Sequence, residues 1–140
     1  MPDKPAAEVS FDTALIRGLL ADQALATIPD ATGLPLRKVA EGWDSEVWRL
    51  GGEYAVRLPR RALAAPLVLH EQAVLPGVAE RLAPLDVRVP APVVAGVAGH
   101  GYPWAWSVVP WIDGVSALDQ PRAERGEWAD TLARALVALH

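Results

Sequence analysis

The feature that most limits how this chain can fold is a pair of glycines, Gly51 and Gly52, between two runs of β-forming residues. Both central positions of a tight hairpin favour positive φ, which glycine adopts without a steric penalty. The stretch 42–60 therefore predicts a turn, a strand, a two-residue hairpin and a second strand. Because side chains alternate along a strand, Ala55 and Arg57 share one face of the second strand.

A small residue followed by a cation on one face lets a strand lie against a purine and reach its phosphates. Ala55 and Arg57 have this arrangement. The alternative is a plain hairpin whose Arg57 points into water. The hairpin alone does not decide between these interpretations.

Composition limits the class of protein. A chain of 140 residues can build one domain with a real core. The net charge of −4 argues against nucleic acid as a partner, and the lack of cysteine excludes disulfides and thiolate metal sites. The N-terminus is polar, and no uninterrupted apolar run approaches the ~20 residues that span a bilayer. We therefore expect no membrane partner and a cytoplasmic location.

The chain divides into helical and extended segments in a definite order. Asp12 is expected to cap a helix that runs to about Ala26. Pro59 should end the third strand, and Pro76 should kink or split the helix in which it lies. The expected elements, after a loose tail at 1–9, are a helix at 12–26, strands at 36–41, 47–50 and 53–58, a helix at 65–82, an extended run at 87–96 that ends in a strand, a hairpin turn at 99–102, a strand within 103–114, and a helix at 121–140.

Three segments carry a family resemblance: GWDSEVWRLGGEYAVRLPRR, HEQAVLPGVAERLAP and VPAPVVAGVAGHGYPWAWSVVPWIDG. In this order they resemble the N-terminal half of the aminoglycoside phosphotransferase family, from about residue 10 to the last residue. The resemblance implies an α+β fold, the small lobe of a protein-kinase-like fold with a five-stranded antiparallel sheet and helices. It implies an ATP-binding lobe at 10–108, an interlobe linker at 109–114, and the first helix of a truncated large lobe at 115–140.

The resemblance also implies where the nucleotide phosphates bind. Gly42 and Ser45 belong to the turn that covers them, and Arg57 stands where the family usually has a lysine that anchors them. Glu71, on the next helix, would pair with Arg57, whereas Glu80 is expected to be solvated.

The chain departs from the pattern at this turn. It has one glycine instead of a glycine-rich loop, and the carboxylates of Asp44 and Glu46 would repel phosphate if they turned inward. Arg60 and Arg61, just past the strand, are expected to be solvated surface charges.

The linker supplies the expected adenine contacts through its backbone. The carbonyl of Pro110 would accept from N6 and the N–H of Ile112 would donate to N1, with Val109 at the back of the pocket and Ala55 against the base. Three tryptophans nearby could form a stacking platform, but at this spacing they are expected to be core residues. They are Trp104, Trp106 and Trp111.

The residues for phosphoryl transfer itself are not found. The family's catalytic loop reads like His-Gly-Asp with a later asparagine, and here no histidine begins a His-x-Asp sequence and asparagine is absent. We therefore expect no catalytic residue and no metal ligand in this chain, and no activity from it alone. ATP is the expected cofactor, with Mg²⁺ held by residues missing from the chain.

Two hypotheses remain open. The chain is either the ATP-binding half of a phosphotransferase that acts on a hydroxyl of a small molecule, or a complete, non-catalytic nucleotide-binding or protein-interaction module. The helix at 121–140 favours the first, because its apolar stripe has little of the small lobe to pack against. Such a stripe also favours self-association. It consists of Trp128, Leu132, Leu136 and Leu139.

Overall fold

The computed structural model describes residues 3–140, and its first helix is α1 (Thr13–Gln23). Asp12 caps this helix as expected, since its Oδ1 accepts from the backbone N–H of Leu15 at 2.7 Å. The helix ends before the expected Ala26, and a series of turns follows. Ile16, Leu19 and Leu20 are fully buried on its inner side.

Five strands form one antiparallel sheet, which confirms the expected α+β fold. They are β1 (Leu36–Glu41), β2 (Ser45–Leu50), β3 (Tyr54–Pro59), β4 (Val94–Gly96) and β5 (Trp106–Pro110). Their order in the sheet is β1-β2-β3-β5-β4, with every neighbouring pair antiparallel. The β2–β3 hairpin turns at the twin glycines as predicted. Its loop has three residues, 51–53, instead of the predicted two, because Leu50 pairs with Tyr54, and of the two glycines only Gly51 has a positive φ, +60°.

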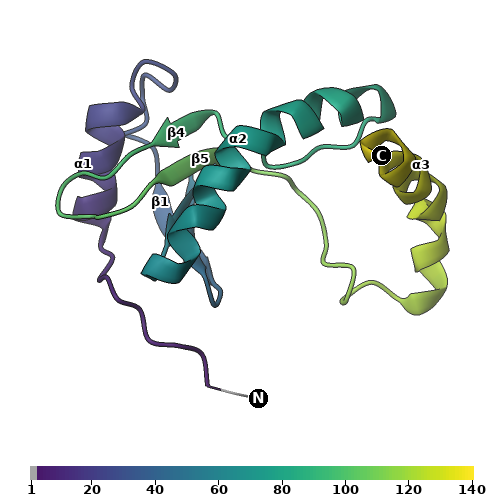
Figure 1. The fold of residues 1–140 in the computed structure, drawn as a ribbon, viewed down its shortest axis with the longest axis horizontal. Coiled ribbons are helices and arrows are strands. Elements are labelled where there is room, and N and C mark those ends of the chain that lie inside the picture. Colours follow the sequence, from purple (N-terminus) through teal and green to yellow (C-terminus); the bar gives the residue numbers. More distant parts are fainter. Residues whose placement is uncertain (1–2) are drawn as a thin grey trace.

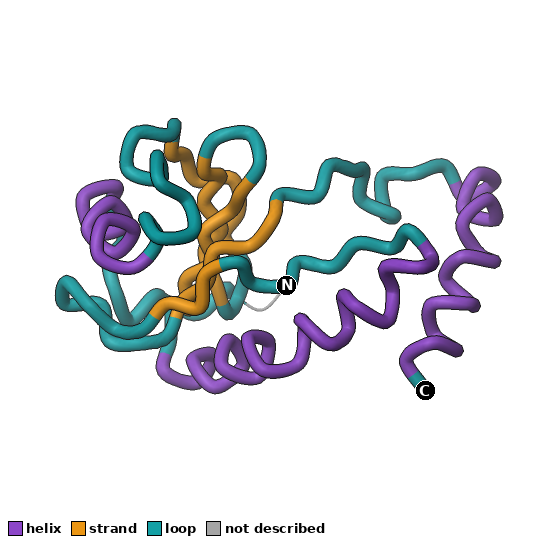
Figure 2. The backbone as a smooth tube through the Cα atoms, turned by 90° about the horizontal axis from the view of Figure 1, so that it is seen from above, coloured by secondary structure: helices purple, strands orange, loops and turns teal. Residues whose placement is uncertain are grey.

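The two faces of the sheet carry different helices. α1 covers one face, and α2 (Ala65–Leu82) lies on the other (Figures 1 and 2). The hydrophobic core is on the α1 face, where inward side chains of β2, β3 and β5 meet the helix. Its main members are Ile16, Leu19, Leu20, Trp48, Leu50, Val56, Leu58, Trp106 and Val108.

Helix α2 runs from Ala65 to Leu82 with Pro76 inside it. Pro76 was expected to kink or split the helix, and a split does not occur, because a proline removes one backbone hydrogen bond and the turns on both sides keep theirs. Together with the short 3₁₀ helices η1 (Ala62–Ala64) and η2 (Ala83–Leu85) it forms one continuous helical stretch.

This stretch, Ala62–Leu85, is 24 residues long with a mean hydropathy of 1.3, which is enough to cross a membrane by length and composition alone. The stretch is still not an uninterrupted apolar run, because His70, Glu71, Gln72, Glu80 and Arg81 lie within it. Glu71 and Gln72, near its middle, bond to the sheet, which is how this helix is held in the fold.

The chain leaves the sheet after β5 and ends in a helix. The 3₁₀ helix η3 (Arg122–Trp128) leads into α3 (Ala129–Leu139), which packs against α2 and η2 away from α1 (Figure 1). The expected single helix at 121–140 therefore begins as a 3₁₀ segment. Of α3 only Ala135 is buried, and the stripe residues Trp128, Leu132 and Leu136 are exposed.

A close contact between β4 and β5 gives a test of the packing. A Cβ on Gly96 would lie 2.2 Å from the ring of Trp106, which is fully buried and donates from Nε1 to the Val97 carbonyl. We expect Gly96→Ala to lower the free energy of unfolding by about 1–3 kcal/mol, since the ring has no room to move. Chemical denaturation measures this.

Gly77 in α2 provides the matched control, because nothing lies within 4 Å of a Cβ built there. Gly77→Ala should raise the free energy of unfolding by about 0.5–1 kcal/mol. An unchanged denaturation midpoint for Gly96→Ala would contradict the packing described.

Candidate functional site

The strand register places the predicted strand residues on the α2 face of the sheet. Arg57 of β3 lies opposite Val47 of β2 and Ser107 of β5, and Ala55 lies opposite Val109. Cross-strand partners share a face. Ala55, Arg57 and Val109 therefore point to one side of the sheet, away from the hydrophobic core.

An ion pair joins this face to helix α2. Arg57 Nη1 lies 2.6 Å from Glu71 Oε2, and both side chains are part-buried. Glu80, the other glutamate of the helix, is exposed. Arginine stays charged at any physiological pH, so Arg57 keeps a fixed cation at the surface of the sheet.

The neighbouring residue of α2 fixes the helix to β5. Gln72 Nε2 donates to the backbone carbonyl of Trp106 at 2.8 Å and to Oγ of Ser107 at 3.0 Å. Ser107 is buried. Sequence reasoning did not single out Gln72 or Ser107, although a polar residue beside Glu71 on an otherwise apolar helix was a signal for a second contact.

The turn between β1 and β2 is held by two arginines from the end of β3. Arg60 donates from Nη1 to the carbonyl of Gly42 at 3.0 Å, and its backbone N–H donates to the carbonyl of Asp44 at 2.8 Å. Arg61 donates from Nε to the carbonyl of Trp43 at 3.3 Å and pairs with the Asp44 carboxylate at 3.2 Å.

The expectation that both arginines are solvated is therefore wrong. Arg60 is only 4% exposed, and its Nη2 lies 3.1 Å from Glu41 Oε1. A buried arginine needs a charged partner, and the sequence alone does not show that Glu41 of β1 reaches it.

Both carboxylates of the turn, those of Asp44 and Glu46, already have hydrogen-bonding partners within the protein. Asp44 pairs with Arg61, as above. Glu46 is buried on the core face, where it accepts from Nζ of Lys38 at 2.9 Å and from Nε1 of Trp48 at 2.9 Å. The electrostatic objection raised by these two residues is thereby removed. Of the predicted phosphate-turn residues, Gly42 donates its N–H to the carbonyl of Ser45 at 2.9 Å.

The expected tail contributes to this region as well. Residues 1–2 lie outside the described residues, and residues 3–9 form no helix or strand. Lys4 Nζ pairs with Glu41 Oε1 at 2.6 Å, and the carbonyl of Pro5 accepts from Arg60. Glu8 Oε2 accepts from the backbone N–H of Ala62 at 2.9 Å. The segment 4–8 is therefore bonded to the sheet rather than loose.

The hydrogen bonds of β5 define which way the linker backbone points. The carbonyl of Val108 accepts from Val93 on the β4 side, and the N–H of Trp111 donates to Glu53 on the β3 side at 2.7 Å. Backbone groups of a strand point alternately to its two sides. By this alternation the carbonyl of Pro110 and the N–H of Ile112 point to the β4 side, beyond the β4–β5 pairing, whose last pair in this direction is Val94 with Val108.

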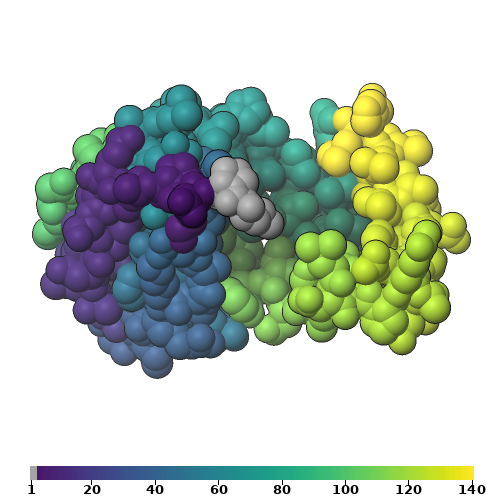
Figure 3. All heavy atoms as spheres, turned by 90° about the horizontal axis from the view of Figure 1, so that it is seen from below, coloured from purple at the N-terminus to yellow at the C-terminus, as the bar shows by residue number. Residues whose placement is uncertain are grey.

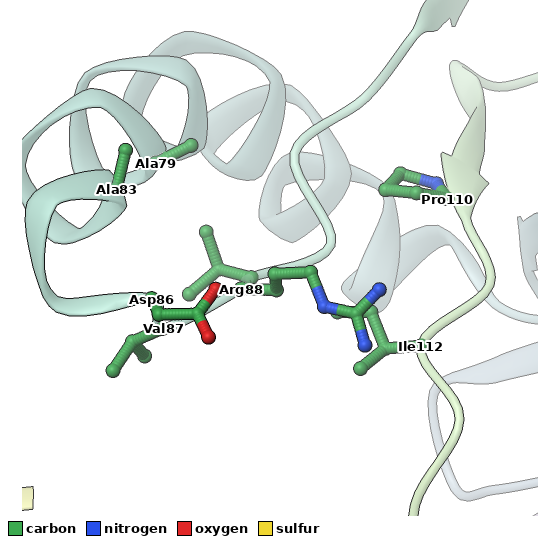
Figure 4. Close-up of a pocket in the computed structure, with 8 residues that line it drawn as sticks. Ala79, Ala83, Asp86, Val87, Arg88, Pro110 and Ile112 are labelled. Carbon is green, nitrogen blue, oxygen red and sulfur yellow. The ribbon is translucent and has the colours of Figure 1, made fainter. Parts of the chain in front are cut away.

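A cavity opens at this linker edge. Its volume is about 280 Å³, just below the ~300–1,000 Å³ usual for small-molecule sites. Figure 4 shows Arg88 reaching from the connector before β4 toward Ile112. Its lining is Ala79, Ala83, Asp86, Val87, Arg88, Val89, Pro110 and Ile112.

The cavity includes only part of the predicted site. Pro110 and Ile112 line it, whereas Gly42, Ala55 and Arg57 do not. Gly42 lies in the exposed β1–β2 turn, and Ala55 and Arg57 lie on the α2 face of the sheet, where Ala55 is 3% exposed. The structure therefore does not bring the predicted residues together in one enclosed pocket. A larger cavity of about 500 Å³ lies between η2 and α3 and contains none of them.

The three tryptophans at and before the linker, Trp104, Trp106 and Trp111, lie in different environments. Trp106 is a core residue, and Trp104 packs edge-on against Tyr102 at 5.8 Å between ring centroids. Trp111 is half-buried, with the guanidinium of Arg49 4.3 Å from its ring centre and its Nε1 bonded to Asp113. No stacking platform is formed, and the core expectation holds for Trp106.

The described residues offer no metal site. Within 3–140 no three His, Asp or Glu side chains are grouped so that they could hold a metal ion. The described residues therefore provide no such cluster of carboxylate or imidazole ligands for Mg²⁺.

A comparison with known protein families identifies the family of this chain. The model of the phosphotransferase enzyme family (APH) matches residues 35–140. The chain therefore belongs to this phosphotransferase family. No curated protein shows a significant match to it.

Solved structures share the fold. The GDP complex of wild-type aminoglycoside 2'-phosphotransferase-IIIa superposes with a TM-score of 0.71 at 16% identity, over 92% of this chain and 42% of that one. The streptomycin–ATP complex of APH(2")-IIa gives 0.58 at 19% identity, over 94% and 40%. ADP-bound APH(2'')-Ib gives 0.55 at 18%, over 93% and 40%. The chain thus spans about two fifths of these proteins.

The carboxylate beside the turn gives a pH test. The ammonium of Lys38, and after it that of Lys4, lowers the pKa of Glu41 from 4.5 to about 2. Because the folded-state pKa is lower than the unfolded one, this stabilisation is present above pH 4.5 and is lost as the pH falls to about 2. Glu41→Gln should reduce the fall in stability over this range, as denaturant midpoints would record.

The matched control is Glu80→Gln, which removes an exposed glutamate from α2. It should leave the pH dependence close to that of the unaltered chain. An identical acid profile for Glu41→Gln would contradict the ion-pair network of Glu41 with Lys4, Lys38 and Arg60.

Proposed function

We propose that this chain is the nucleotide-binding part of a phosphotransferase that transfers the γ-phosphate of ATP to a hydroxyl group of a small molecule. The observation that carries the proposal is the Arg57–Glu71 ion pair on the sheet face shared with Ala55 and Val109. A strand cation held by a helix glutamate is the arrangement that kinases use to anchor nucleotide phosphates.

In this proposal Arg57 binds the phosphates and Glu71 holds its guanidinium in place. Glu71 occupies one side of the planar fork and leaves the other donors for phosphate oxygens. Ala55 has only a methyl group and is 3% exposed, so the strand has little side-chain bulk at the point where the purine would lie. The turn Gly42–Glu46, with Ser45, would cover the phosphates from above.

The linker edge supports adenine as the base. Pro110 provides a carbonyl acceptor and Ile112 an N–H donor on the same side of the chain. Adenine offers a donor at N6 and an acceptor at N1, which complements this order. Guanine has an acceptor at O6 and a donor at N1, the opposite polarity. We therefore propose ATP rather than GTP as the preferred nucleotide, although the relatives include complexes with GDP, ADP and ATP.

The acceptor is proposed only as a class. Streptomycin is named in one related complex, at 19% identity. During transfer, the hydroxyl oxygen of the acceptor bonds to the γ-phosphorus, the bond to ADP breaks, and the hydroxyl proton is lost. The residues of this chain would bind and orient the nucleotide for that step. Mg²⁺, which neutralises the phosphates in such reactions, would be held by residues other than those described.

The phosphate anchor is tested by nucleotide titration. Arg57→Met removes the cation, and a charge-assisted hydrogen bond to phosphate is worth about 1.5–3 kcal/mol, so ATP affinity should fall roughly tenfold to a hundredfold. Glu71→Gln should weaken ATP less, because Arg57 keeps its charge. Isothermal titration with ATP measures both changes.

Glu80→Gln is the matched control for Glu71→Gln, since it alters an exposed glutamate of the same helix. It should leave ATP affinity unchanged. Unaltered ATP binding in Arg57→Met, with circular dichroism unchanged, would remove Arg57 from the site.

The base contacts are tested at the linker. Ile112→Pro removes the one N–H proposed to bind adenine, and an unpaired buried acceptor costs about 1–3 kcal/mol, or roughly tenfold to a hundredfold in ATP affinity. Ile112→Val keeps the N–H and should change little. Equal ATP affinities for Ile112→Pro and Ile112→Val, with both folded, would show that the base binds elsewhere.

A further inference from the structure

We propose that Arg60, together with the N-terminal segment Lys4–Glu8, positions the turn Gly42–Glu46 over the nucleotide phosphates. This inference rests on the proposed function and adds to it a device that holds the turn. Nothing in the resemblance assigns a role to Arg60 or to the N-terminal segment.

Arg60 is the centre of the arrangement. Its guanidinium contacts three groups: the carbonyl of Gly42 at 3.0 Å, the carbonyl of Pro5 at 3.3 Å, and Glu41 Oε1 at 3.1 Å. Its backbone also binds at both ends, since its N–H donates to Asp44 and its carbonyl accepts from Glu8 at 2.9 Å. With 4% of its surface exposed, Arg60 has no freedom to adopt other positions.

Arg60 approaches the turn from the side opposite to the proposed phosphates. Glu41, its ionic partner, lies opposite Glu46, which is buried on the core face. Arg57 projects from the other face of the sheet. Arg60 therefore binds the turn from behind and leaves the Arg57 face open to a ligand.

Bonding the carbonyls of the turn has an electrostatic consequence. Carbonyl oxygens repel phosphate, whereas backbone N–H groups attract it. Arg60 binds the carbonyls of Gly42 and Asp44, and Arg61 binds that of Trp43. The carbonyls of Gly42, Trp43 and Asp44 are thus each bonded to Arg60 or Arg61, in a turn that has only one glycine.

The N-terminal segment connects the turn to helix α2. Lys4 pairs with Glu41 at one end, and Glu8 accepts from the N–H of Ala62, at the start of η1, at the other. Figure 3 shows the purple N-terminal residues against both the blue β1–β2 region and the teal helix. Residues 4–8 therefore link the turn to the start of the helical stretch that carries Glu71.

A role limited to stability would weaken the binding of every ligand of the site, whereas a role in positioning the turn concerns phosphates alone. The experiment therefore compares ATP with adenosine, which has the same base and no phosphate. Dissociation constants for both are measured by calorimetry in the unaltered protein, Arg60→Met and Arg60→Lys. Arg122→Met is the control, because it removes an exposed arginine of η3.

We expect Arg60→Met to weaken ATP about tenfold and to leave adenosine affinity unchanged. Arg60→Lys, which keeps the charge without the fork, should lie between the two. Hydrogen–deuterium exchange at residues 42–46 should accelerate in Arg60→Met and not in Arg122→Met. If Arg60→Met does not fold, the double variant Lys4→Met/Glu8→Ala, altered only at exposed residues, should give the same selective loss.

Two results would overturn the inference while the proposed function stands. One is unchanged ATP affinity in the folded Arg60 variants, and the other is an equal loss for ATP and adenosine. An unaltered protein that binds neither ligand would overturn the proposed function, and the positioning role with it.

Discussion

Helix α2 is attached to the sheet by polar side chains more than by an apolar interface, and the candidate site depends on this attachment. Of its 18 residues only Val68 and Leu82 are buried. Glu71 binds Arg57, and Gln72 binds β5. A partly exposed ion pair contributes only about 0–1 kcal/mol to stability. These polar contacts therefore fix where the helix lies on the sheet but add little to the free energy that holds it there. Phosphate oxygens bound beside Arg57 would compete with Glu71 for its guanidinium and so would act directly on this attachment.

The alternation of side chains along β3 separates the hydrophobic core from the candidate site. Val56 and Leu58 face α1 and are fully buried in the core, whereas Ala55 and Arg57 face α2. A change on one face therefore leaves the other largely undisturbed. Two glutamates are separated in the same way. Glu46 pairs with Lys38 on the core side of the sheet, whereas Glu71 pairs with Arg57 on the α2 side. One strand thus supplies both the centre of the core and the cation of the site.

The sequence predicted the parts of this structure that depend on local rules. Twin glycines defined the β2–β3 hairpin, Asp12 defined the start of α1, and period-two alternation placed Arg57 with Ala55. The ion pair of Arg57 with Glu71, which is present, was expected from the family resemblance and not from a local rule.

Contacts between distant segments were not predictable in this way. Arg60 was expected in solvent, because its partners lie at Pro5, Glu41 and Gly42, and no periodicity joins residues so far apart. The segment 4–8 lacks a helical or strand pattern and was taken for a tail, although its contacts are made by single side chains. Pro76 was expected to kink or split α2, and the helix is not split, since a local rule does not include the support of the turns on either side.

The proline of the linker has a consequence for how the site is kept in register. Pro110 lies opposite Tyr54 at the end of β5, and it has no N–H. A shift of the linker by two residues, the smallest that returns the same backbone edge to the ligand, would put Pro110 where Ile112 now offers its donor. The shifted chain would meet the base with two acceptors and no N–H. A linker shifted in this direction would therefore be unable to bind the base in the way proposed for the native one.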